Sequence, residues 1–318
     1  MSAPPVSGQR SGGSAVRGTV RVALDAMGGD HAPAVTVEGA LRARAAGLEV
    51  VLVGQPALLH AALAEAGASD EFTVVVATDV VRMDEDPALA LRTKRDTSIR
   101  VAARLVASGK VDALVSAGST GATLAAALLV IGRVPGVRRP VVGALIPTRR
   151  AGRAVLVDAG GSAEAQPEAL VGYARMGMAY AGVLGSQAPR VGLLNVGVET
   201  GKGNALAKAA RALLGSTPGF VGNVEPRDVL DGAVDVVVTD GFTGNIFLKT
   251  VEAASGGYGD SAAVVLGVAG EVLVAHGAAT AEEVAEAVRM AAKAALAGLW
   301  GRVAAQLEQQ ETLRGRTN

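Results

Sequence analysis

Short, continuous apolar runs constrain the fold of this sequence more than any other feature. Alternation between apolar and polar residues, the mark of a half-exposed strand, is missing from them, as expected for strands buried on both faces. They predict a sheet that is covered on both sides. The runs are VRVALD (20–25), VVLVG (50–54), FTVVVA (72–77), DALVSAG (112–118), VVGALIP (141–147), AVLVDAG (154–160), RVGLLNVG (190–197) and VDVVVTD (234–240).

Helical patterns lie between most of these runs. Strand–helix alternation implies right-handed crossovers, so we expect an α/β fold with three αβα layers and a largely parallel, Rossmann-like sheet. A last long helix is predicted from a capping box, Thr280 to Glu283, with an apolar stripe reaching Leu307 that suits a core or a dimer contact. The other predicted helices span 33–47, 56–66, 96–108, 119–132, 167–184 and 203–214.

The domain organisation follows from composition along the chain. Residues 1–18 are rich in Ser, Gly, Pro and Arg and lack the apolar core of a signal peptide, so they predict a disordered leader. Residues 19–318 are predicted to form a single α/β catalytic domain. A division into two lobes would fall near 148–153.

Composition excludes several function classes. Lys plus Arg equals Asp plus Glu at 30 each and aromatic residues make up 3%, which argues against a nucleic-acid partner. The chain has no cysteine and three histidines without metal-ligand spacing, so we expect no metal, and the cysteine count suits a cytoplasmic protein. Neither a G-x-G-x-x-G nor a P-loop motif occurs in a suitable position, and we expect no cofactor.

Four predicted strand ends carry glycines and small polar residues that lead into helices. In open parallel sheets, ligands bind beyond the carboxyl ends of strands, where helix N-termini favour anions. We therefore predict an anion site, for phosphate, although tight turns and N-caps are the structural alternative for each loop taken singly. The predicted binding residues are Asp25, Gly28, Gly29, His31, Ser116, Gly118, Ser119, Thr120, Gly121, Asn195, Asn204, Asp240, Gly241, Thr243 and Gly244.

These loops, taken together and in order, resemble one family closely. DAMGGDHAP, SAGSTGA, GRVPGVRRP, VGLLNVGVETGKGN and VVVTDGFTGN are similar to signatures of the phosphate acyltransferases of bacterial phospholipid synthesis, the PlsX family. The resemblance covers about residues 20–252 and resumes near LGVAGEVLVAHG. It implies a homodimeric enzyme, similar in fold to phosphotransacetylases and isopropylmalate dehydrogenases, that transfers a fatty acyl group from acyl carrier protein to inorganic phosphate.

The resemblance also implies roles for two residues and a cellular setting. Lys202 and Asn245 fall where the family places its catalytic lysine and asparagine. We expect Lys202 to pair with phosphate and Asn245 to donate to the developing oxyanion. The family's peripheral contact with the membrane is expected here only in weakened form. Two alternatives stay open: a phosphotransacetylase-like enzyme with a shorter acyl donor, and a non-catalytic dimeric homologue.

Three departures from the family pattern bear on these expectations. Helices that the family carries after LKTVE have no counterpart beyond Glu252, which puts membrane contact and long-chain access in question. The family's Gly-Ala-Asn with a following Lys-Pro or Arg-Pro becomes Gly160, Gly161 and Ser162, with Gln166 before proline. The family's His-Gly-Ser-Ser becomes His276 to Ala279, so that Ala278 and Ala279 replace two hydroxyls.

Overall fold

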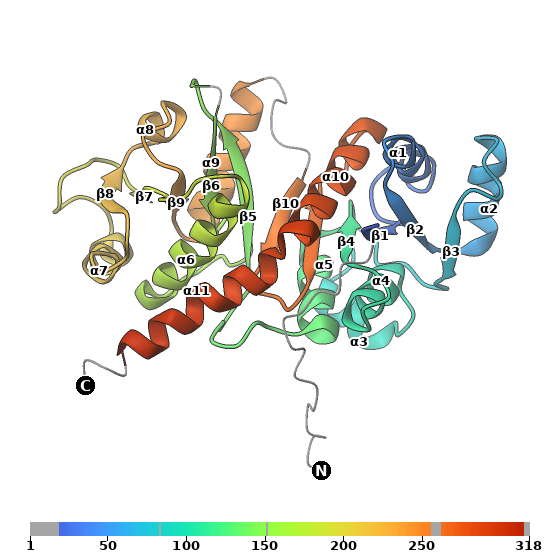
Figure 1. Ribbon diagram of the computed structural model, residues 1–318, viewed down its shortest axis with the longest axis horizontal. Coiled ribbons are helices and arrows are strands. Elements are labelled where there is room, and N and C mark those ends of the chain that lie inside the picture. The colour runs from blue at the N-terminus through green and yellow to red at the C-terminus, as the bar shows by residue number, and fades with distance from the viewer. Residues whose placement is uncertain (1–18, 83, 151, 256–261, 315–318) are drawn as a thin grey trace, which may run out of the picture.

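A single sheet of 11 strands organises the molecule in the computed structural model, which describes residues 19–82, 84–150, 152–255 and 262–314 (Figure 1). The strand order is β3-β2-β1-β4-β11-β10-β5-β6-β9-β7-β8. The strands are β1 (Arg21–Asp25), β2 (Glu49–Gly54), β3 (Thr73–Val76), β4 (Ala113–Ser116), β5 (Val141–Pro147), β6 (Arg153–Val157), β7 (Val191–Leu194), β8 (Phe220–Val224), β9 (Val236–Val238), β10 (Ala262–Leu266) and β11 (Glu271–Ala275).

Strand direction changes at the centre of the sheet. Seven neighbouring pairs are parallel, which confirms a largely parallel sheet. The pairs β11–β10, β10–β5 and β5–β6 are antiparallel. As a result β6, β9, β7 and β8 run opposite to β1–β4 and β11, and the carboxyl ends of the two groups lie at opposite edges of the sheet.

Helices cover both faces, which confirms three αβα layers. Along β1, Val22 and Leu24 face the cluster formed with α1, α2, α6, α7, α10 and α11, whereas Ala23 faces the cluster formed with α4 and α5. Helices α8 and α9 continue this second layer over β5 and β6. The helices are α1 (Ala34–Ala45), α2 (Pro56–Glu65), α3 (Pro87–Thr93), α4 (Ser98–Ala107), α5 (Thr120–Ala126) with a π-helical turn η1 (Ala127–Ile131), α6 (Pro167–Val183), α7 (Ala205–Leu214), α8 (Pro226–Leu230), α9 (Gly241–Ala254), α10 (Ala281–Ala297) and α11 (Leu299–Arg314).

The predicted last helix is in fact two helices. Its start is confirmed: Thr280 and Glu283 form the capping box of α10. The prediction of one continuous helix is wrong, because Gly298 adopts a left-handed conformation (φ 61°) and ends α10. Glycine takes this conformation without the steric cost that a Cβ imposes. Helix α11 then leaves in a new direction and packs on α6 (Figure 1).

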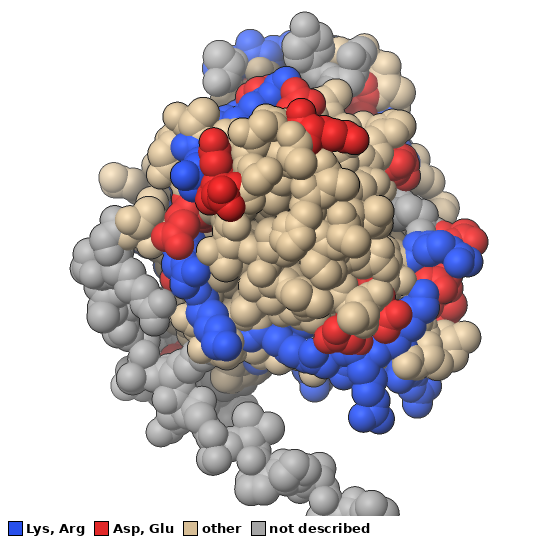
Figure 2. Space-filling model, turned by 90° about the vertical axis from the view of Figure 1, so that its right-hand side faces the viewer, with Lys and Arg blue, Asp and Glu red and all other residues tan. Residues whose placement is uncertain are grey.

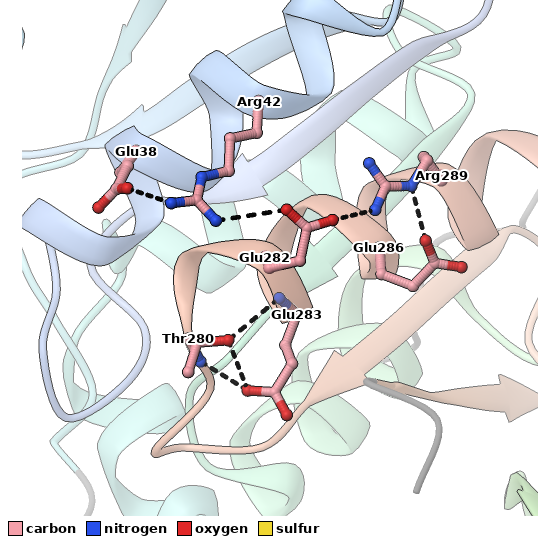
Figure 3. Close-up of polar contacts among 7 residues, drawn as sticks. All are labelled: Glu38, Arg42, Thr280, Glu282, Glu283, Glu286 and Arg289. Carbon is pink, nitrogen blue, oxygen red and sulfur yellow. Dashed lines mark hydrogen bonds and ion pairs between the residues drawn. The ribbon is translucent and has the colours of Figure 1, made fainter. Parts of the chain in front are cut away.

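Helices α1 and α10 are tied by a chain of charged side chains (Figure 3). Arg42 of α1 binds Glu38 on its own helix and Glu282 of α10, and Glu282 also binds Arg289. Arg289 in turn pairs with Glu286. Exposed pairs of this kind contribute little singly, so we assign the stability of this contact to the buried apolar residues beneath, such as Val37 and Val284.

The β3 end of the sheet presents a broad uncharged surface. Figure 2 shows this side of the molecule with an uncharged centre and charged residues around its margin. Among the strands of the described residues, β3 pairs only with β2, and Val76 on β3 and Leu58 on α2 are exposed. At this end Arg44 pairs with Glu71 and lies over the Phe72 ring, 5.6 Å from its centroid.

A buried carboxyl group holds the start of α11. Glu271, at the first position of β11, accepts a hydrogen bond from the backbone N–H of Trp300 at 3.0 Å. Burial raises the pKa of Glu271 to about 8, although hydrogen bonds from the Trp300 and Leu299 backbones oppose the shift. The side chain therefore keeps its proton in the folded protein at neutral pH.

The raised pKa of Glu271 predicts that stability falls as the pH rises. The unfolded chain releases this proton near pH 4.5, whereas the folded protein releases it near pH 8. The protonated carboxyl therefore contributes its full share of the free energy of unfolding below pH 4.5, and this share is lost as the pH rises through 8. We expect Glu271→Gln to remove this loss of about 1–3 kcal/mol between pH 6 and 9. Urea unfolding of both proteins across that range measures it, with the exposed Glu65→Gln as control. Parallel pH curves for wild type and Glu271→Gln would contradict the prediction.

Two connections bear on the expected organisation. Residues 148–152 join β5 to β6, which pair as antiparallel neighbours within the one sheet. Between the end of α9 at Ala254 and the start of β10 at Ala262 only seven residues intervene, too few for a helix pair. The predicted leader, residues 1–18, lies outside the described residues. No helix in the described part of the chain is long and apolar enough to cross a membrane.

Candidate functional site

A pocket of about 510 Å³ lies between the N-terminal end of α5 and one face of α9. Val142 and Ala144 of β5 and Ala263 of β10 contribute to its apolar wall. Gly118 and Thr120 line one side and Gly160 and Asn245 line the other, so loops from opposite edges of the sheet meet across its face. The remaining lining residues are Leu145, Ala159, Leu248, Lys249, Glu252, Ala262, Val274, Ala275, His276, Gly277, Ala278, Ala279 and Glu283. We call this the α5–α9 pocket.

Glycines seat the first turn of α9 against the loop that follows β6. A Cβ at Gly244 would collide with the backbone oxygen of Asp158, and one at Gly241 would collide with the backbone oxygen of Ser162. Real Cβ atoms do not approach other atoms so closely. The close contact fixes where α9 begins and therefore where Asn245 is placed.

Asn245 presents a free amide to the pocket. It is half-buried and lies beside Gly160, where a Cβ would stand 3.4 Å from the Asn245 side-chain nitrogen. Within the described residues its side chain has no hydrogen-bond partner. An unengaged N–H donor in a pocket can bind a ligand oxygen.

Asp158 organises the loop beside Asn245, and sequence reasoning missed it. It is fully buried, and its Oδ1 accepts hydrogen bonds from the backbone N–H groups of Val142, Gly160 and Gly161 at 3.0, 3.1 and 2.7 Å. Its Oδ2 accepts from the N–H and the hydroxyl of Ser162 at 2.8 and 3.0 Å. The signal was an acid directly after a buried strand, followed by donors at the second, third and fourth positions.

A second buried acid supports the α5 side of the pocket. The hydroxyl of Ser116 donates to Asp25 Oδ2 at 2.7 Å, and the backbone N–H of Gly118 donates to Ser116 Oγ at 3.1 Å. Burial raises the pKa of Asp25, while hydrogen bonds from Ser98, Ser116 and the Met27 backbone partly offset the shift. Asp25 thus orders the turn that carries Gly118 into the pocket.

Several predicted binding side chains serve as helix caps. Ser119 caps α5, Asn204 caps α7 and Asp240 caps α9, each accepting from a backbone N–H three residues on. Thr243 donates its hydroxyl to Asp240 at 2.8 Å. The side-chain oxygens of these residues accept hydrogen bonds from their own helices. This is the N-cap role that the sequence allowed as the alternative to anion binding.

A second, larger pocket of about 1010 Å³ lies along the opposite face of α9. Its wall includes the apolar α9 residues Ile246, Phe247 and Val251. Asn195, Asn204, Asp240 and Thr243 are among its polar lining residues. Its charged residues are engaged: Arg149 pairs with Asp231, and Asp240 caps α9. Helix α9 therefore separates a pocket with unpaired polar groups from one that is mainly apolar.

The predicted residues are thus divided. Gly118, Thr120 and Asn245 share the α5–α9 pocket, whereas Asn195, Asn204, Asp240 and Thr243 share the larger one. Lys202 is exposed and lines neither pocket, although the adjacent Gly203 lines the larger one.

Four further predicted residues lie around the α5 loop. Gly28 is packed so that a Cβ would stand 2.7 Å from the Gly118 nitrogen, and Gly29 (φ 109°) lies against Gly277. Gly121 lies against Pro87 of α3. His31 is exposed and lines neither of the two pockets flanking α9.

Of the departures from the family pattern, the one at residues 276–279 lies at the α5–α9 pocket. Ala278 and Ala279 line it, so methyl groups stand where the resemblance places hydroxyls. Ser162 is engaged by Asp158 and lies 3.2 Å from the Tyr173 hydroxyl. Gln166 precedes α6 without a side-chain cap bond. No group of three or more His, Cys, Asp or Glu residues suited to a metal occurs within the described ranges.

Sequence comparison identifies one family. A family model described as "Fatty acid synthesis protein" matches residues 20–257. A phosphate acyltransferase of Desulfitobacterium hafniense is 51% identical over 241 residues, covering 74% of this chain and 72% of the relative. A phosphate acyltransferase of Thermus thermophilus is 52% identical over 235 residues, covering 73% and 71%.

A longer alignment shows what the chain lacks. The phosphate acyltransferase of Nostoc punctiforme is 42% identical over 315 residues, covering 86% of this chain and 93% of the relative. The alignment has more positions than the number of residues of this chain that it includes. The relative therefore has residues without a counterpart here. The seven-residue connection between α9 and β10 agrees with such a gap.

Solved structures show the same fold. A phosphotransacetylase from Streptococcus pyogenes superposes with a TM-score of 0.67 at 19% identity, covering 88% of this chain and 94% of that one. A branched-chain phosphotransacylase from Enterococcus faecalis gives 0.62 at 16% identity, covering 87% and 99%. A 4-hydroxythreonine-4-phosphate dehydrogenase from Klebsiella pneumoniae gives 0.56 at 18% identity, covering 87% and 98%.

Proposed function

This chain belongs to the phosphate acyltransferase family, and from that premise we propose that it transfers a fatty acyl group from acyl carrier protein to inorganic phosphate, giving an acyl phosphate for phospholipid synthesis. Family membership makes the chain an acyltransferase. The structural observation that supports the proposal is the free amide of Asn245 in the α5–α9 pocket.

In the proposed reaction a phosphate oxygen attacks the thioester carbonyl carbon. A new C–O bond forms, and the carbonyl π electrons move to oxygen, giving a tetrahedral oxyanion. Collapse of this intermediate breaks the C–S bond, and the carrier thiolate leaves and takes a proton from water. Phosphate is itself the nucleophile, so the reaction needs no serine, cysteine or metal for attack. Its demand on the protein is positioning and charge stabilisation.

Asn245 suits the stabilising role. The side chain lines the pocket, and its N–H groups can donate to the carbonyl oxygen as negative charge develops there. Such a donor acts more strongly where water is partly excluded, as beside the apolar strands β5 and β10. The hydrogen bond from the Gly160 N–H to Asp158 keeps the adjoining loop in place beside Asn245.

Lys202 enters the proposal through the family resemblance. It stands between glycines on the loop after β7, and we propose that it adds positive charge for the anionic substrates. Lys202→Ala is expected to lower kcat/KM by about 10-fold or more, since charge-assisted hydrogen bonds contribute about 1.5–3 kcal/mol. Initial rates of acyl phosphate formation measure this, with the exposed Lys208→Ala on α7 as a matched control. Equal rates for the two variants would remove Lys202 from the mechanism.

The activity is tested by incubating the purified protein with long-chain acyl carrier protein and phosphate, then trapping acyl phosphate with hydroxylamine. Hydroxamate that requires both substrates supports the proposal. Product from short acyl donors alone would instead select a phosphotransacetylase-like enzyme. A folded protein without product under either condition would select the non-catalytic alternative.

Assembly and location extend the same proposal. We propose a homodimer that acts in the cytoplasm and meets the membrane weakly, since a seven-residue link stands between α9 and β10. Sedimentation of the purified protein, with and without phospholipid vesicles, tests both parts.

A further inference from the structure

We infer that Lys249 is a substrate-binding residue of the α5–α9 pocket and that it holds a phosphoryl oxyanion beside Asn245. The inference rests on the proposed function and assigns the cation of the same site. Lys249 follows Asn245 by four residues on α9, and positions i and i+4 lie on one face of a helix. Both side chains line the pocket, whereas the intervening Ile246 and Phe247 line the larger pocket on the opposite face.

The charges around the pocket make this lysine necessary for an anion. Of the residues that line it, all within the described part of the chain, Lys249 alone carries a permanent positive charge. Glu252 and Glu283 bring two carboxylates to the same wall. Glu283 is engaged by the backbone and hydroxyl of Thr280 at the start of α10. Without Lys249 an entering phosphate would meet the two carboxylates with no positive side chain in the pocket lining to balance its charge.

Lys249 is also available for a ligand. No hydrogen bond or ion pair connects its side chain with another residue in the described ranges. The residue is exposed, and its flexible four-carbon stem lets the ammonium group turn toward a ligand in the pocket. Val142, Ala144 and Ala263 form an apolar part of the same pocket wall, and the attraction between an ammonium and an oxyanion strengthens as a ligand displaces water from such a surface.

The ligand chemistry is a phosphoryl oxyanion, and two substrates carry one. Inorganic phosphate is the first, and the phosphodiester that joins the prosthetic thiol of an acyl carrier to its protein is the second. With Asn245 at the thioester oxygen, an ammonium group one helical turn away is placed to bind either. Separate titrations of the two substrates distinguish them.

The experiment measures initial rates of acyl phosphate formation by Lys249→Gln, Lys249→Arg and wild type. We expect Lys249→Gln to raise KM about 10-fold or more for one of the two substrates, because a charge-assisted bond is lost. A rise for phosphate assigns the free ion, and a rise for acyl carrier assigns the phosphodiester. Lys249→Arg, which keeps the charge, is expected to restore most of the affinity. Lys293→Gln, an exposed lysine on α10, is the matched control.

Unchanged KM values for both substrates, or a loss of kcat alone, would overturn the inference. A binding measurement separates it from the proposed reaction. The melting temperature of wild type, Lys249→Gln and Lys293→Gln is compared in phosphate and in chloride of matched ionic strength. If phosphate raises the melting temperature of wild type and Lys293→Gln but not of Lys249→Gln, the result supports an oxyanion site even if no acyl phosphate forms. If phosphate raises the melting temperature of all three proteins equally and the KM values are unchanged, the inference is rejected.

Discussion

Replacing Asn245 by alanine is expected to lower kcat for acyl phosphate formation by about 10²–10³-fold, the usual cost of losing one oxyanion donor. The side chain lies at the pocket wall without another partner in the described residues, so its removal leaves the loop after β6 and its hydrogen bonds intact. We therefore expect the unfolding free energy to change little. Hydroxylamine trapping under saturating substrates measures kcat, and urea unfolding checks the fold.

Two further variants sharpen this test. Asn245→Asp keeps the size of the side chain but replaces the N–H donor by a negatively charged acceptor. Because this carboxylate would repel the oxyanion, kcat should fall at least as far as in the alanine variant. Thr250→Ala, on the opposite face of α9, is expected to keep wild-type kcat. If Asn245→Ala retained more than about a third of the wild-type rate, the donor role in acyl transfer would be refuted.

Replacing Asp158 by alanine is expected to have the largest effect on stability, on the order of 3–5 kcal/mol, because buried N–H groups are left without an acceptor. The carboxylate accepts five hydrogen bonds, and two come from the backbone and hydroxyl of Ser162. The loop it holds also seats Gly241 and Gly244 of α9. We expect activity to fall with stability, since Asn245 depends on that contact.

Urea unfolding at neutral pH measures the effect of Asp158→Ala. Asp158→Asn retains one oxygen that can accept from Gly160 and Gly161 but loses the acceptor for Ser162, so a smaller loss of stability is expected. Asp231→Ala, which removes an exposed ion pair with Arg149, serves as the control and should cost less than about 1 kcal/mol. A loss for Asp158→Ala as small as that of Asp231→Ala would show that the loop is held by other contacts.

The fold class was predictable because apolar runs and helical stripes record burial directly. Strand direction is not recorded in this way. An apolar run such as 141–147 reads the same whether its neighbour is parallel or antiparallel, so the reversal through β10, β5 and β6 was invisible. Strands β10 and β11 escaped prediction because they stand among small residues near Gly267 and Gly270.

The break between α10 and α11 shows the same limit on a smaller scale. The apolar stripe from Val284 through Leu299 to Val303 continues across the break, since both helices bury one face. Gly298 was the single local signal, and glycine within a helical pattern is often tolerated. The left-handed conformation of Gly298 depends on the packing of α11 against α6, a tertiary contact that the local sequence does not encode.

The sequence pointed to loops that line the two pockets, but it did not reveal the contacts of their side chains. Ser119, Asn204 and Asp240 use their side-chain oxygens as helix caps. Asp158 was overlooked because the run at 154–160 was interpreted as strand to its end. Lys249 lay within a helical stretch, where one lysine among LKTVE resembles any solvated residue until the helix is placed against a pocket.

The reversal of strand direction has a mechanical consequence for the α5–α9 pocket. Gly118 and Asn245 belong to halves of the sheet whose strands run in opposite directions, and β11, β10 and β5 lie between β4 and β6. A ligand that contacts both sides of the pocket therefore connects two halves that are joined through these central strands. Any twisting of the central strands would change the distance between the two sides that such a ligand must bridge.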